Sequence, residues 1–153
     1  MNYNKKINRI SEITDFYLNR FGRTQIGIFQ LPTADPDSPW FYIFTNTLMV
    51  TMRRKDIMPY NFWVRDENAN RFILIVWGSG YFRSDLHDIA PIVNRIWSFH
   101  SHEPVIILGS FSLSVESVDE KACFYQTAAN LLSAVNVTSA NWHQRTFGGS
   151  VLQ

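Results

Sequence analysis

The sequence predicts an α+β fold of the ferredoxin-like, split βαβ type, with an extra helix at each end. After an opening helix, segments with strand alternation and segments with helical spacing follow one another in the order β-α-β-β-α-β, and a further helix closes the series. A short polar link joins the second and third strands as a hairpin. The third strand is apolar almost without interruption, which is typical of a strand buried on both faces.

The chain opens with an amphipathic helix over residues 5–20 and a strand over 25–31. In the helix, apolar residues recur at helical spacing: Ile7, Ile10, Ile13, Phe16 and Tyr17. In the strand, apolar residues nearly alternate, and Pro32 ends the pattern. A loop rich in Pro and Asp follows, in which Ser38 is placed as a helix N-cap and Pro39 as the first helical residue.

A helix is expected from about Trp40 to Arg54, and the hairpin comes next. Its strands run over 60–65 and 71–77, and residues 66–70 form the turn. Gly78-Ser79-Gly80 is expected to break the second hairpin strand. In the predicted topology, strands 25–31 and 71–77 lie in the middle of the sheet.

The last third of the chain adds a helix, a strand and a helix. An apolar stripe at helical spacing runs through 85–100, a strand is expected over 105–111, and the final helix over 118–134. The 153 residues suit a single domain, 1–153. Within it we expect an N-terminal helix at 1–21, the βαββαβ core at 22–117, and the C-terminal helix and tail at 118–153.

Composition limits the class of protein. Hydrophobic residues make up 46% of the chain, which supplies a core and excludes disorder as the main state. The net charge is only +1, but the first 55 residues hold 8 Lys/Arg against 4 Asp/Glu, so a local basic patch is expected there. Because no segment has the length of a membrane span or a signal peptide, we expect a cytoplasmic protein without membrane contact.

Basic and aromatic residues suggest a nucleic-acid site. Arg53, Arg54 and Lys55 form the densest basic cluster, although cations are also favoured at any helix C-terminus. Phe62-Trp63-Val64-Arg65 and Arg71-Phe72 place rings and guanidinium groups on neighbouring strands, as base-stacking sheets do. Core packing is the simpler explanation of these aromatic residues, and the RNA-recognition signature is absent.

Catalytic and metal sites have weaker support. His100 and His102 resemble the paired histidines of zinc-dependent deubiquitinase-type metalloproteases, but Leu113 stands where that family has a metal-binding Asp. A helix-end role explains both histidines better. Cys123 is expected to be a small buried hydrophobic residue. We therefore expect no cofactor, no bound metal and no enzymatic activity.

Two segments resemble the inovirus-type rolling-circle replication initiators, which are HUH endonucleases. These are Phe62-Trp63-Val64-Arg65-Asp66-Glu67, followed by a turn and an apolar strand, and the tail Arg145-Thr146-Phe147-Gly148-Gly149-Ser150. The family carries two metal-binding histidines where this chain has Arg71-Phe72-Ile73. Its nucleophilic tyrosine would fall near Ala129-Asn130, one helical turn after Tyr125. The resemblance thus implies an initiator fold without the endonuclease chemistry.

Two functions follow as hypotheses. The first is a catalytically inactive initiator-like protein of a prophage or mobile element, which binds single-stranded or duplex DNA, or replication proteins, without cleavage. Its candidate contacts are Arg53, Arg54, Lys55, Arg65, Arg71, Arg145, Trp63 and Phe72. The second is a protein-interaction or regulatory module of a phage or defence system, with no nucleic-acid role. Rings and arginines on one open sheet face favour the first; an apolar patch with few cations favours the second.

Overall fold

The computed structural model describes residues 3–32, 39–66, 71–80 and 89–135. Within these residues, helices and strands follow one another in the predicted order, which confirms the α+β class and the ferredoxin-like arrangement. The elements are α1 (Tyr3–Phe21), β1 (Arg23–Pro32), α2 (Trp40–Arg54), β2 (Met58–Asp66), β3 (Arg71–Ser79), α3 (Ile89–Trp97), β4 (Ile106–Ser114) and α4 (Val118–Ala134). Among these helices, none is both long and apolar enough to cross a membrane.

The four strands form one antiparallel sheet in the order β2-β3-β1-β4. The prediction that the first and third strands are central is therefore correct. β1 pairs with β3 from Gln25 opposite Gly78 to Pro32 opposite Arg71. On its other side β1 pairs with β4, where the register shifts between Ile28 and Phe29. β2 and β4 are the two edges of the sheet.

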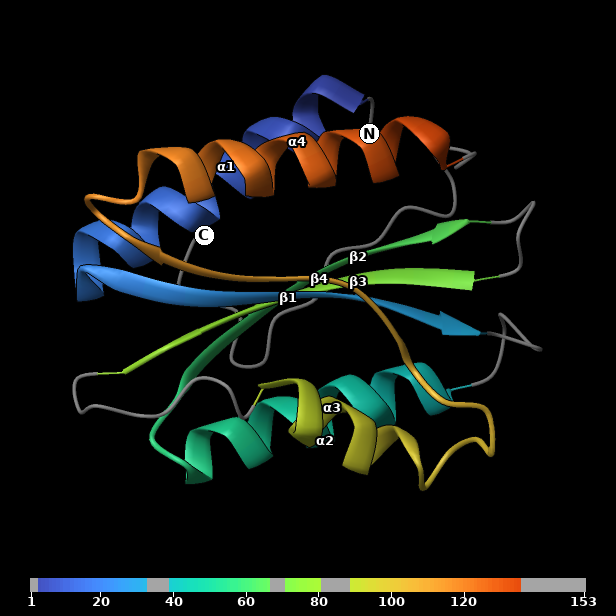
Figure 1. Cartoon of the computed structure of the whole chain (residues 1–153). Helices are drawn as coiled ribbons and strands as arrows, with labels where there is room; N and C mark the ends of the chain where they lie inside the picture. The colour runs from blue at the N-terminus through green and yellow to red at the C-terminus, as the bar shows by residue number, and fades with distance from the viewer. Residues whose placement is uncertain (1–2, 33–38, 67–70, 81–88, 136–153) are drawn as a thin grey trace.

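Helices cover both faces of this sheet, so the structure has three layers (Figure 1). Figure 1 shows α1 and α4 on one face, and α2 and α3 on the other. Along β3, Leu74 and Val76 pack on the α2–α3 side, whereas Ile73, Ile75 and Trp77 pack on the α1–α4 side. The continuous apolar run of β3 is explained by this double burial.

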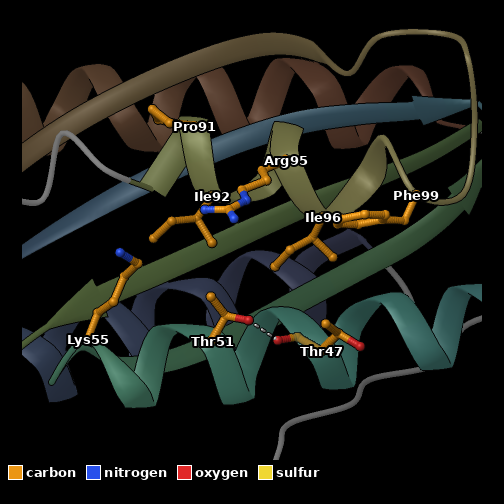
Figure 2. A pocket seen from close by; sticks show the side chains of 8 residues that line it. All are labelled: Thr47, Thr51, Lys55, Pro91, Ile92, Arg95, Ile96 and Phe99. Carbon is orange, nitrogen blue, oxygen red and sulfur yellow. Dashed lines mark hydrogen bonds between the residues drawn. The ribbon is translucent and has the colours of Figure 1, made fainter.

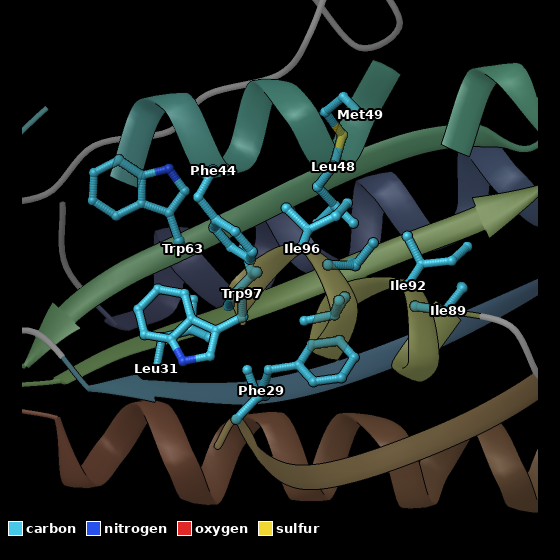
Figure 3. Packing of buried hydrophobic residues seen from close by; sticks show 14 of the residues in the cluster. Phe29, Leu31, Phe44, Leu48, Met49, Trp63, Ile89, Ile92, Ile96 and Trp97 are labelled. Carbon is cyan, nitrogen blue, oxygen red and sulfur yellow. The ribbon is translucent and has the colours of Figure 1, made fainter. Parts of the chain in front are cut away.

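The core on the α2–α3 side is rich in aromatic rings (Figure 3). Phe41 of α2 stacks on Phe72 of β3 with ring centroids 4.1 Å apart, and the Phe41 ring lies 4.8 Å from the ring of Trp63. Trp97, labelled in Figure 3, ends α3 and donates a hydrogen bond from Nε1 to the backbone oxygen of Glu103 at 2.8 Å. This bond ties the segment after α3 to the core.

β3 does not break at Gly78, contrary to the sequence prediction. Gly78 pairs with Gln25 and with Pro59, and the strand continues to Ser79. A Cβ atom at position 78 would lie 2.9 Å from a methyl group of Ile57 and 3.0 Å from Ile89. The glycine therefore allows close packing at the start of α3 rather than a turn.

Other boundaries also move. β4 extends to Ser114, three residues beyond the expected end, because its pairing with β1 continues to Arg23. Pro39 is the N-cap of α2 and not its first helical residue, while the predicted cap Ser38 lies outside the described residues. Of the helix expected over 85–100, the structure describes Ile89–Trp97, and residues 98–100 form a turn instead.

Buried polar groups fix α1 on the sheet. Trp77 donates from Nε1 to the hydroxyl of Thr14 at 3.1 Å, and that hydroxyl donates to the Ile10 carbonyl at 2.8 Å. The Tyr17 hydroxyl donates to the carbonyl of Met58 at 2.8 Å. Thr14, Tyr17 and Trp77 are fully buried. Since a buried polar group without a partner is costly, these bonds select one rotation and one axial position of α1.

We expect Thr14→Val to lower the free energy of unfolding by about 1–3 kcal/mol, because it leaves the indole N–H of Trp77 buried without an acceptor. Thr127→Val is the matched control: its hydroxyl makes the same i to i−4 bond, at 2.9 Å to the Cys123 carbonyl, but in an exposed position. Urea unfolding of both variants measures the difference. Equal losses in the two variants would contradict the role given to Thr14.

Alkaline pH should destabilise the fold through Tyr17. Burial, with a further contribution from Tyr60, raises the pKa of the Tyr17 hydroxyl above its ordinary value near 10. Above about pH 10 the unfolded chain ionises at this residue while the folded protein does not, so stability falls by up to about 1.4 kcal/mol per pH unit. Urea unfolding across this pH range should show a shallower decline in Tyr17→Phe. An unchanged pH dependence would be the contrary result.

Candidate functional site

The described basic residues predicted to contact nucleic acid fall into two groups, at opposite ends of the β2–β3 hairpin. Arg53, Arg54 and Lys55 are exposed where α2 ends, close to the first residue of β2. Arg65 and Arg71 lie at the opposite end of the β2–β3 hairpin. Arg65 is seven positions after Met58 along an extended strand, which is a distance of about 23 Å. Arg145 lies outside the described residues.

The two predicted stacking rings are buried. Trp63 and Phe72 are only 3% and 4% exposed, and both pack against Phe41 beneath α2. Neither ring is available to a base on the surface. The expectation of base stacking is therefore replaced by core packing, the simpler of the two interpretations of the sequence.

Arg71 already has partners within the protein. Its Nε donates to a carboxylate oxygen of Asp66 at 3.1 Å, and its Nη1 donates to the side-chain oxygen of Gln30 at 2.6 Å. Asp66 is almost fully buried, so this cation compensates a buried charge. Through these contacts Arg71 of β3 links the end of β2 to β1.

His100 and His102 are both exposed in the segment after α3. The ring of His100 lies 6.0 Å from the ring of Phe44 and 6.4 Å from that of Trp40. Within the described ranges, no three His, Cys, Asp or Glu residues are grouped so as to hold a metal ion. The structure thus places His100 at the edge of an aromatic cluster.

Cys123 is exposed on α4, contrary to the expectation that it is buried. The buried stripe of α4 consists of Phe124, Ala128 and Leu132, which follow one another at intervals of four. Cys123 stands one position before this stripe and is turned toward solvent.

A groove between α2 and α3, with a volume of about 460 Å³, is open to a ligand (Figure 2). The two helices run in opposite directions along it. Figure 2 shows Lys55 at the same end as Pro91, and Thr47 at the end of Phe99. The residues that line it are Thr47, Thr51, Lys55, Pro91, Ile92, Arg95, Ile96 and Phe99.

Helical spacing produces both walls of this groove. Thr47 and Thr51 of α2 and Lys55, the residue that caps the end of α2, are four residues apart and lie on one side of the helix, and Pro91 and Arg95 have the same spacing on α3. Eight residues of helix give the groove a length of about 12 Å. Its floor consists of Ile92 and Ile96, which are nearly buried.

The groove is apolar at one end and cationic at the other. The ring of Phe99 is exposed at the apolar end. In Figure 2 the Lys55 side chain reaches toward α3 and the Arg95 guanidinium lies over Ile92. No Asp or Glu is among the described residues that line the groove, and neither cation forms a salt bridge with another described residue. An anionic group is therefore the complementary ligand at this end.

The threonine wall accepts rather than donates hydrogen bonds. The Thr47 hydroxyl donates to the Ile43 carbonyl and the Thr51 hydroxyl to the Thr47 carbonyl, each at 2.8 Å. The second of these bonds is the dashed line in Figure 2. Both hydroxyl protons are thus committed to the helix, and Lys55 and Arg95 supply the side-chain donors of the groove.

Comparison of the chain with protein-family models, curated proteins and solved structures finds no match. The resemblance to replication initiators therefore stays a prediction from the sequence.

Of the groove residues, only Lys55 was singled out from the sequence, and then as a phosphate contact. The spacing of Thr47, Thr51 and Lys55 on the polar side of a predicted helix was the available signal. It does not reveal which neighbouring helix supplies the second wall.

Proposed function

We propose that the protein is a protein-interaction module that binds a short amphipathic helix of a partner in the α2–α3 groove. The partner helix carries apolar residues toward Ile92 and Ile96 and an acidic residue toward Lys55 and Arg95. The observation that carries this proposal is an apolar floor beside two cations, with no acidic residue among the described residues that line the groove. This is the second of the two functions predicted from the sequence.

The shape of the groove favours a helix as its occupant. Two antiparallel helices present parallel ridges, and the groove between them accepts a third helix. A length of about 12 Å corresponds to about two helical turns. Apolar side chains at positions i, i+3 or i+4, and i+7 of the partner would lie along the floor.

Nucleic acid is less well matched to this site. A polyanion requires a track of cations along its backbone, whereas here two cations stand at one end of an apolar floor. The rings that would stack bases lie in the core instead. By the criterion set from the sequence, an apolar patch with few cations favours a protein partner.

The test is a selection of displayed helical peptides against the full chain. We expect the enriched peptides to combine apolar residues at helical spacing with an acidic residue near one end. Their binding should weaken at least about tenfold in the double variant Lys55→Glu/Arg95→Glu, since charge reversal places like charges together. Arg54→Glu is the matched control: this neighbouring cation is exposed but does not line the groove.

Oligonucleotide binding is measured on the same variants, with single-stranded and duplex DNA. The proposal is contradicted if the selected peptides bind the double variant as well as the unaltered protein. It also fails if DNA binds saturably and Arg54→Glu weakens that binding as much as the groove substitutions do. That result would restore the initiator-like hypothesis.

A further inference from the structure

The outer edge of β4 lacks two of the features that usually protect a sheet edge, a charged residue and a proline, although its register with β1 shifts at Leu108. β4 is the last strand in the sheet order, and Ile106–Ser114 contains no charged residue and no proline. Natural edge strands commonly carry one or the other, because an unpaired row of N–H and C=O groups attracts further strands. The opposite edge, β2, contains Pro59 and is buried along nearly its whole length.

β4 is also open on one of its faces. Leu113 is buried, and the Phe111 ring lies 5.4 Å from the ring of Phe124 of α4. Ser110 and Ser112 point to the other side of the sheet, as the alternation of a strand requires, and both are exposed. From Gly109 to Ser114 the pairing with β1 is regular, so the other edge of this stretch can pair with a further strand.

Exposed apolar side chains stand at both ends of this strand. Ile106 and Ile107 at its start are 49% and 48% exposed, while Val115 and Val118 beyond its end are 65% and 74% exposed. These are four of the seven large apolar residues that are exposed in the described part of the chain. Exposed apolar residues near both ends of one edge strand are typical of an interaction surface.

We propose that β4 pairs antiparallel with β4 of a second copy of this chain, across a two-fold axis within Gly109–Ser114. The two sheets then join into one. In a two-fold antiparallel pair, the start of each strand lies beside the end of the other, so Ile106 and Ile107 meet Val115 and Val118 of the second copy. A strand without charges pairs with itself without repulsion between like charges. Self-pairing therefore uses the exposed groups at both ends of the strand.

This pairing is independent of peptide binding. The groove is formed by α2 and α3, and none of its residues belongs to β4. Substitutions on one surface can thus be tested without altering the other.

Sedimentation equilibrium of the full chain over a wide concentration range tests the pairing. We expect a reversible dimer whose dissociation constant rises at least about tenfold in Ile107→Lys, which places a cation against the apolar residues at the end of the second copy's strand, and in Ser110→Lys, which places two cations near the axis. Ile43→Lys is the matched control, since Ile43 is a comparably exposed isoleucine on α2. A chain that stays monomeric at every concentration overturns the proposal, as does a dimer that tolerates both β4 substitutions.

Cross-linking locates the contact. In a Cys123→Ser background, a single cysteine introduced by Ser110→Cys should give a covalent dimer with a short thiol cross-linker, because position 110 lies close to the axis. Thr47→Cys in the same background is expected to give none. Cross-linking at Thr47 with none at Ser110 would place the dimer contact elsewhere and reject pairing through β4.

Discussion

The burial of β3 on both faces is the constraint on which the rest of the structure depends. Its apolar side chains point alternately to the two sides of the sheet, so helices must shield both faces from water. α2 and α3 cover one face, and α1 and α4 cover the other. The helices before and after the βαββαβ core are therefore part of the core packing. As a consequence, β3 presents no open face to a ligand among the described residues.

Buried hydrogen bonds fix the position of α1 on its face of the sheet. The Trp77–Thr14 and Tyr17–Met58 hydrogen bonds join α1 to β3 and β2, where apolar packing alone would permit sliding and rotation. With β3 covered on both faces, two surfaces of the described residues remain open for recognition: the groove between α2 and α3, and the edge strand β4. The first suits a helix and the second a strand. A dimer formed through β4 would carry two copies of the groove.

Much of the fold follows from residue patterns, but the site does not. The apolar run after Arg71 correctly predicts a central strand, and the helix over 118–134 is found with the same bounds. Trp63 and Phe72 are buried because both rings pack against Phe41, which is distant from them in the sequence. The periodicity of the sequence does not predict such a long-range contact. The prediction that the strand breaks at Gly78 is wrong because the sequence does not distinguish a glycine that allows a helix to pack closely from a glycine that ends a strand. The groove was missed since it requires knowing that α3 lies beside α2.

The most direct test of this account is native-state hydrogen exchange of the Trp77 indole N–H, followed by NMR. If α1 covers the sheet through its bond to Thr14, this proton should exchange only through global unfolding, with the same free energy as the slowest amides of β3. An indole proton that exchanges through a local opening of much lower free energy would mean that α1 leaves the sheet readily. The face on which Trp77 lies would then be an accessible surface, and the three-layer account would be wrong.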